Sequence, residues 1–267
     1  MFTTERLLSD AEADNTARVL QALTWKGESG KWVDPRALNN QAVRHASRNG
    51  NLDVVLALLA WKGPKGQWVD PRDFTQQAML IASEQGHVDV VEALLKWNGP
   101  GGEWVDPTVE NNWSVRMAAL HGHLRVLRAL LEWRGPKRQW VDPRVIFNIA
   151  VRSASAEGYL GVVKTLLEWR GPGGAWVDPR ECGDAAVWKA SFKGHVDVVQ
   201  AVLEWRGPTG EWVDIGVARA KTECRDILLL CDEEEGVRAR WTPLRQAWIW
   251  AVAMGGLRRK VATTNAV

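Results

Sequence analysis

The sequence predicts an all-α solenoid, in which helix–turn–helix units joined by long loops stack side by side. First, a Trp-Val-Asp motif recurs every 36 residues, five times as Trp-Val-Asp-Pro and once as Trp-Val-Asp-Ile; its six copies begin at Trp32, Trp68, Trp104, Trp140, Trp176 and Trp212. Second, glycine and Gly-Pro stand at fixed places in each interval. Third, the apolar residues between them follow a helical period. One helix pair cannot bury its own apolar face, whereas a stack of pairs can, so the repeat implies a solenoid.

The repeat divides the chain into six units and a tail. Units 1 to 6 are residues 1–36, 37–72, 73–108, 109–144, 145–180 and 181–216. We interpret residues 1–36 as an N-terminal capping repeat, because the face of their first helix is polar. Residues 37–216 then form five regular repeats, and residues 217–267 a degenerate C-terminal repeat or cap with a Trp-rich helix.

Each unit contains the same elements in the same order. A helix-capping side chain stands at the fourth residue of most units, where it can accept a hydrogen bond from a first-turn amide; these residues are Thr4, Asn40, Asn112, Asn148 and Asp184. About ten residues later a glycine, as at Gly86, ends the first helix. The second helix carries apolar pairs one turn apart, and Gly99-Pro100 ends it in unit 3. Trp-Val-Asp-Pro is expected to be extended.

These residues resemble the ankyrin repeat. The pattern Ala-Ser-x-x-Gly-His-x-x-Val-Val-x-x-Leu-Leu spans Ala82–Leu95, and Ala190–Leu203 matches it with one conservative change. The unit is three residues longer than the usual ankyrin repeat, and the Thr-Pro-Leu-His opening of that family is replaced. This variant is similar to ankyrin arrays of protists and of their large DNA viruses. The resemblance implies that the Gly-His histidines His87, His123 and His195 bond between adjacent units.

Seventeen tryptophans stand against one tyrosine and four phenylalanines. Twelve of them occupy two fixed places per unit, at the end of the second helix and at the start of Trp-Val-Asp. We expect two parallel rows in which each ring packs on its neighbour, since aromatic burial is strongly stabilising. The alternative is an exposed platform that stacks sugars or bases. Because binding surfaces tend to vary between units and packing positions do not, we favour the buried ladder.

Composition and motifs exclude several classes of function. The formal net charge of +2 is small for a nucleic-acid binder, and no apolar run approaches the length of a membrane span. The N-terminus lacks a signal peptide, so we expect an intracellular protein, cytoplasmic or in another compartment, and in the host cell if the source is viral. No nucleotide-binding loop, nucleophile motif or metal-ligand spacing occurs. We therefore predict no enzymatic activity, no cofactor and no metal.

The residues that differ between units predict where partners bind. In ankyrin arrays, the resemblance implies, partners meet the loop tips and the exposed side of the first helix. The apolar residues at these places, with two tryptophans outside the repeating rows, are Leu38, Phe74, Val109, Trp113, Leu120, Val145, Ile146, Trp188 and Phe192. Exposed apolar residues can mark an interaction patch. The alternative is that the long loop covers some of them.

The tail contains a second candidate surface. Thr242 and Pro243 form a helix-start signal, and the following segment around Trp248 and Trp250 is apolar on all sides. Such a helix must be covered. Either residues 257–267 fold back over it or it docks a partner or a second copy, and we favour docking because that segment is small and polar.

The sequence thus predicts a non-catalytic scaffold for protein–protein interaction. One alternative is a structural subunit of a large assembly, such as a virion or an organellar complex. The other is a module that binds a ligand through exposed tryptophan rows. Partner identity and oligomeric state have no signal in the sequence.

Overall fold

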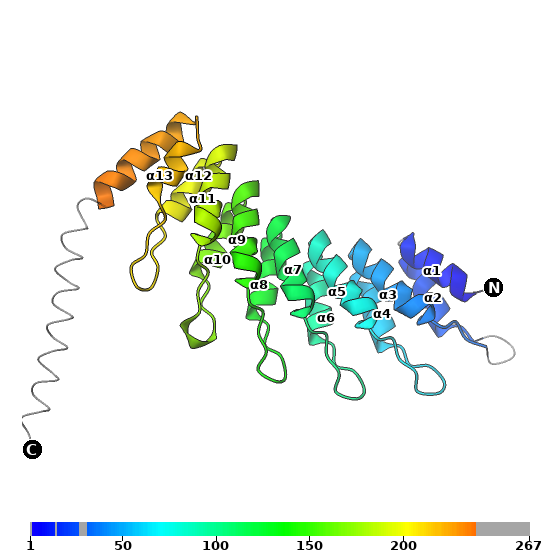
Figure 1. The fold of residues 1–267 in the computed structure, drawn as a ribbon. Helices are drawn as coiled ribbons and strands as arrows, with labels where there is room; N and C mark the ends of the chain where they lie inside the picture. Colours follow the sequence, from blue (N-terminus) through cyan, green and yellow to red (C-terminus); the bar gives the residue numbers. More distant parts are fainter. Residues whose placement is uncertain (1, 14, 27–30, 239–267) are drawn as a thin grey trace, which may run out of the picture.

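The protein is a curved stack of helix pairs with hairpin loops projecting from one edge (Figure 1). The computed structural model describes residues 2–13, 15–26 and 31–238, so Trp248 and Trp250 lie outside the described residues. First helices are α1 (Thr4–Glu12), α3 (Ala37–Asn49), α5 (Asp73–Gln85), α7 (Val109–Leu120), α9 (Val145–Glu157) and α11 (Glu181–Lys193). Second helices are α2 (Thr16–Thr24), α4 (Leu52–Ala60), α6 (Val88–Lys96), α8 (Leu124–Glu132), α10 (Leu160–Glu168) and α12 (Val196–Leu203).

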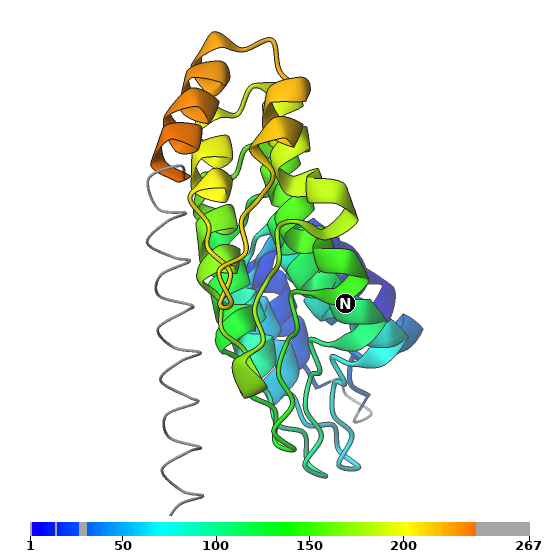
Figure 2. The ribbon, with the colours of Figure 1, turned by 60° about the vertical axis from the view of Figure 1, so that its left-hand side comes forward.

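The helices form two rows. Each first helix packs on the first helix of the next unit, and each second helix packs on the next second helix. Figure 2 shows these rows as two layers, with the loops extending below them. Isolated antiparallel bridges within the hairpins are the β structure of the described segments, and a short 3-10 helix, η1 (Pro172–Gly174), lies in one loop.

The turn between the two helices depends on glycine for two reasons. Gly86 has a φ of +81°, which L side chains rarely adopt, and a Cβ atom there would lie 2.5 Å from the ring of His123 in the next unit. The His123 ring therefore rests directly on the glycine. Its Nε2 lies 2.8 Å from the carbonyl oxygen of Glu84, and because a carbonyl can only accept, Nε2 carries the proton and donates it.

The other Gly-His histidines make the same bond. His87 Nε2 donates to the carbonyl of Arg48 at 2.8 Å, and His195 Nε2 donates to that of Ala156 at 3.1 Å. Each bond joins one unit to the preceding one, so the interaction between units that the resemblance implies is confirmed.

The long loops of units 2 to 5 are hairpins closed by their tryptophans. In unit 2, Lys62 bridges Trp68 across the hairpin, and the amide of Gly63 donates to the carbonyl of Gln67 at 2.8 Å. The Trp61 ring lies over Gly63, where a Cβ would be 2.7 Å from the ring. The glycine of Trp-x-Gly-Pro is therefore required by the close approach of the ring.

The expected tryptophan ladder is present in a different form. At three interfaces the motif tryptophan of one unit contacts the helix-end tryptophan of the next, so these contacts join the two expected tryptophan rows to each other. Ring centroids are 5.2 Å apart for Trp32 and Trp61, and 5.6 Å apart for Trp140 and Trp169. Of the twelve rings only Trp169 and Trp205 are buried, and the other ten are half-buried. The fully buried residue of the motif is its valine, at most 3% exposed in every copy: Val33, Val69, Val105, Val141, Val177 and Val213.

The predicted capping role of the fourth residue is wrong. The second to fourth residues of units 2 to 6 have positive φ, as in Leu38 to Asn40 with φ of 52° to 56°, so each first helix begins with one left-handed turn. The Asn40 side chain instead accepts from the amide of Asp70 in the next loop at 3.3 Å. In unit 1 the cap is Thr3, whose hydroxyl accepts from the Arg6 amide, and not Thr4.

The tail begins as a shortened unit. α13 (Ile215–Ala220) packs on α11, and a second helix follows over residues 225–238. In it Ile227 and Cys231 are fully buried, as Val90 and Leu94 are in unit 3. Aligned in this way, Glu234 stands where the other units have the helix-end tryptophan. Trp212 is accordingly covered by cations, with the Arg206 and Arg238 guanidinium carbons 4.2 and 4.6 Å from its ring centroid.

Candidate protein-interaction surface

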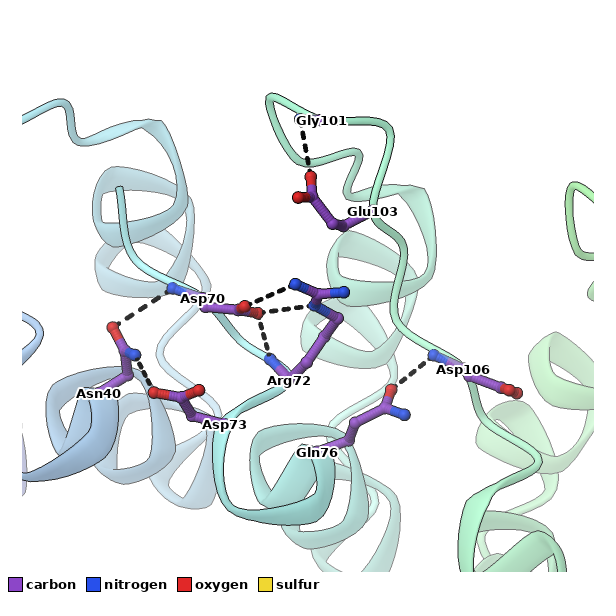
Figure 3. A network of polar contacts seen from close by, with 8 residues as sticks. All are labelled: Asn40, Asp70, Arg72, Asp73, Gln76, Gly101, Glu103 and Asp106. Atoms are coloured by element: carbon purple, nitrogen blue, oxygen red, sulfur yellow. Dashed lines mark hydrogen bonds and ion pairs between the residues drawn. The ribbon is translucent and has the colours of Figure 1, made fainter. Parts of the chain in front are cut away.

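The Asp-Pro turn before each first helix fixes the direction in which that helix starts. In unit 2, Asp70 Oδ1 accepts from the amide and Nε of Arg72, both at 2.9 Å, and Oδ2 accepts from Nη2 at 2.7 Å (Figure 3). The Arg72 guanidinium also lies over the rings of Trp68 and Trp97 at about 6 Å. The motif aspartate is therefore a turn residue, whose side chain holds the start of the next unit.

The Asp–Arg fork recurs with the same geometry and affects ionisation. Asp34, Asp142 and Asp178 bind their arginines in the same way, and Thr108 replaces the arginine in unit 3. Burial alone would raise the pKa of Asp34, but the hydrogen bonds and charge of Arg36 outweigh it and hold that pKa below its usual value. The hydrogen bond to Asp70 raises the pKa of Arg72.

A second contact ties each loop to the preceding first helix. Besides Asn40, the fourth-residue side chains that accept from the amide of the next motif aspartate are Gln76, Asn112, Asn148 and Asp184. Figure 3 shows the contacts of Asn40 with Asp70 and of Gln76 with Asp106. Together with the fork, this bond holds the left-handed turn in place. The turn projects its second and third side chains away from the helix.

The left-handed turns expose apolar side chains. The tip row is defined as the second residues of units 2 to 6: Leu38, Phe74, Glu110, Ile146 and Cys182. Leu38 is 66% exposed, Phe74 60% and Ile146 40%. Phe147, beside Ile146, is 67% exposed. It is the third residue of its unit and is not among the residues that the sequence predicts for this surface.

The other predicted residues divide into two groups. Phe192, near the end of α11, is 73% exposed. Five are half-buried: Val109, Trp113, Leu120, Val145 and Trp188. The two tryptophans lie under cations, with Arg116 at 5.1 Å from the Trp113 ring and Lys189 at 5.9 Å from the Trp188 ring.

Three arginines that the sequence analysis missed support the tips. The arginine row is Arg44, Arg116 and Arg152, each the eighth residue of its unit. Each donates to the carbonyl oxygen of its own tip residue, Arg44 at 2.8 Å, Arg152 at 3.0 Å and Arg116 at 3.3 Å. The recurrence of arginine at the eighth residue of three units is the sequence pattern that could have indicated them.

Other chemistry is sparse in the described part of the chain. There, no cluster of three His, Cys, Asp or Glu side chains could hold a metal ion, although the His121 and His123 rings lie 6.0 Å apart. No helix in the same residues is both long enough and apolar enough to span a bilayer.

These features define a helical-repeat solenoid whose units share one set of contacts. Residues 43–139 match a family model described as ankyrin repeats (3 copies), so the units in this part of the chain are ankyrin repeats. No curated protein matches the chain. Ankyrin repeats are generally protein–protein interaction modules, and the family is typically non-enzymatic.

Proposed function

We propose that this protein is a non-catalytic scaffold that binds a protein partner through the tip row and the adjoining first helices. The observation that carries the proposal is the exposure of Leu38, Phe74 and Ile146 on left-handed turns. Large aromatic and aliphatic anchors of this kind commonly dominate the energy of protein interfaces. Phe192 and Trp188 extend the same face into unit 6.

Asparagine substitution tests this proposal without disturbing the fold. Asparagine tolerates positive φ, and Asn39 and Asn111 already occupy neighbouring left-handed positions. The triple variant Leu38→Asn, Phe74→Asn, Ile146→Asn should fold normally and lose partners that the wild type captures from cells, as measured by affinity purification and mass spectrometry. Leu56→Gln is the matched control, because Leu56 is 48% exposed on α4, in the other row.

The outcome also separates the proposal from a structural-subunit role. A transient scaffold should be a soluble monomer whose captured partners depend on the tips. If the triple variant and each single tip variant still capture every partner of the wild type, the proposal is contradicted.

A further inference from the structure

We propose that the hairpin of unit 4 binds an acidic segment of a protein partner through Arg138, with Lys137 as a second cation. This hairpin is separate from the tip row, so the inference goes beyond the proposed function. Three observations carry it: the conformation of Arg138, the surroundings of its side chain, and the glycines at the tips of the two flanking hairpins.

Arg138 stands where the other units have glycine. The last residue of the Gly-Pro-x-x turn is glycine in units 2, 3, 5 and 6, and these residues are Gly66, Gly102, Gly174 and Gly210. Their φ values lie between 78° and 90°, and Arg138 has a φ of 60°. Glycine adopts this left-handed conformation without cost, whereas an L side chain opposes it. Among the hairpins that the structure describes, only that of unit 4 bears this strain.

The hairpin gains no contact from the arginine. The Arg138 amide donates to the carbonyl of Gly135 at 3.0 Å, and the Gly102 amide makes the same bond to Gly99 at the same length. A Cβ at Gly102 would have no neighbour within 4 Å. The Arg138 side chain is exposed, and no hydrogen bond, ion pair or ring contact joins it to the described residues. Strained residues are concentrated at functional sites, so we infer a functional role for this one.

Lys137 adds a second cation to an open surface. Its ammonium lies 5.3 Å from the centroid of the Trp104 ring in unit 3, which holds it beside the preceding hairpin. The tips of the flanking hairpins are Gly101-Gly102 and Gly173-Gly174, which have no side chains. The two exposed cations therefore lie on a hairpin whose neighbours in the row (Figure 1) leave both sides open to a partner.

The distribution of charge selects the kind of anion. A nucleic-acid backbone is tracked by a continuous basic groove, and an anionic membrane attracts clusters of about 4–8 Lys and Arg. Here Glu103 and Glu211 follow the tips of units 3 and 6, and unit 3 has six acidic residues against one lysine. The basic surface is confined to one hairpin, which suits one or two carboxylates. A guanidinium group such as that of Arg138 can bind a carboxylate with two parallel hydrogen bonds.

Peptide display on the full-length protein at low salt tests the inference with a library of short random peptides. We expect enrichment of peptides with adjacent aspartates or glutamates. Arg138→Gly should weaken their binding about tenfold, Lys137→Gly should weaken it less, and high salt should weaken it for the wild type.

Lys65→Gly is the matched control, because Lys65 has the place of Lys137 in the hairpin of unit 2, where Gly66 follows it. It should leave the binding of these peptides unchanged. Arg138→Gly reproduces the turn sequence of unit 2, and Lys65→Gly that of units 3 and 5. Both variants are therefore expected to fold.

Stability provides a second measurement that does not depend on a partner. Arg138→Gly should raise the urea midpoint of unfolding, since glycine relieves the strain and no contact is lost. An unchanged or lower midpoint would show that the arginine is not strained, and the reason for assigning a function to it would be gone.

Other binding results would contradict the inference. It is overturned if acidic peptides are not enriched, or if they bind the Arg138→Gly variant as well as the wild type. Binding of a single-stranded RNA, or of phosphatidylserine vesicles, that Arg138→Gly abolishes would overturn the protein carboxylate as the anion. The triple variant Leu38→Asn, Phe74→Asn, Ile146→Asn should retain the acidic peptides. Failure of the hairpin tests would leave capture through the tip row, and hence the proposed function, standing.

Discussion

Two glycines with the same backbone conformation have different surroundings. Gly86 and Gly102 both have a φ of +81°, but a Cβ at Gly86 would meet the His123 ring at 2.5 Å, whereas a Cβ at Gly102 would have no neighbour within 4 Å. The pair therefore separates the effect of conformation from the effect of contact between units.

Alanine substitution should resolve the two effects. Gly102→Ala should lower the free energy of unfolding by about 1 kcal/mol, the conformational term alone. Gly86→Ala should lower it by about 2 kcal/mol or more, because His123 must move and its bond to the Glu84 carbonyl, worth about 1 kcal/mol, is weakened. Urea denaturation measures both. Equal losses would mean that the histidine contact contributes nothing to stability.

The strained tips predict a conflict between stability and binding. Ile146 is β-branched and has a φ of 51°, so Ile146→Gly should raise the free energy of unfolding by about 1 kcal/mol. The same variant should bind partners less well. Leu56→Gly, in the middle of α4, is the control and should lower stability by about 1 kcal/mol. A destabilised Ile146→Gly variant would show that the turn is not strained.

At the scale of the element, the sequence predicts the helix pairs well and their starts poorly. The repeated apolar pairs and glycine positions indicate both helices of a unit, because these signals are local. Asn40 misleads, since asparagine favours both a helix cap and a left-handed residue. The loop that follows fixes the left-handed conformation, because the Asn40 side chain accepts from the Asp70 amide thirty residues away. No local sequence pattern reveals this contact.

Some features of the candidate surface can likewise be predicted from the sequence, and others cannot. Leu38, Phe74 and Ile146 can be predicted as exposed from their place after the loop. The half-buried state of Val109 and Val145 cannot, because it depends on how neighbouring first helices pack. The arginine row belongs to the surface only because the left-handed turn brings the tip carbonyls within its reach.

Two aspartates at loop–helix contacts predict opposite responses to pH. Burial raises the pKa of Asp184, and the nearby carboxylate of Asp214 adds to this effect although the Asp214 amide bond opposes it. The charged form is therefore disfavoured in the folded state. Asp184→Asn should stabilise the protein at pH 7, and the advantage should fade as pH falls through the raised pKa and vanish below the ordinary value of 3.8.

Asp34 provides the contrast. Because its pKa is lowered, ionised Asp34 stabilises the fold, and Asp34→Asn should destabilise it at pH 7. That loss should fade as the pH falls below the ordinary value of 3.8, and vanish only below the lowered pKa, where the folded wild-type carboxylate takes up its proton. Unfolding free energies of both variants and the wild type, measured at pH 7 and below pH 3.5, test the signs. If both substitutions changed the unfolding free energy in the same direction at pH 7, the opposite roles assigned to Asp34 and Asp184 would be contradicted.

At the scale of the whole molecule, the last interface differs from all others. Arg238 donates to the carbonyls of Val213 at 2.7 Å and Leu203 at 2.8 Å, and Glu234 pairs with Arg206 at 3.3 Å. The two arginines cover Trp212, whose counterparts Trp32, Trp68 and Trp140 contact a tryptophan of the next unit. The ladder thus ends in a charged cluster.

Replacing the central arginine should loosen one end of the array. Stability in a solenoid is transmitted between neighbours, so Arg238→Gln should increase hydrogen exchange in residues 225–238 and α12, and leave α3 to α6 unchanged. Arg219→Gln is the control, since its partners Asp232 and Glu235 are exposed and such surface pairs contribute little. Uniformly faster exchange along the chain would refute a local cap.

The repeated bonds between units also give the molecule a mechanical character. Hydrogen bonds that join units span 30 to 39 residues, as those of Asn40 and His87 do. A chain held together only by neighbours and pulled from its ends should come apart in discrete steps. Each step releases 36 residues, a gain in contour length of about 120 Å at roughly 3.4 Å per residue. In an optical trap the array should lengthen in a series of equal increments, one for each unit that unfolds.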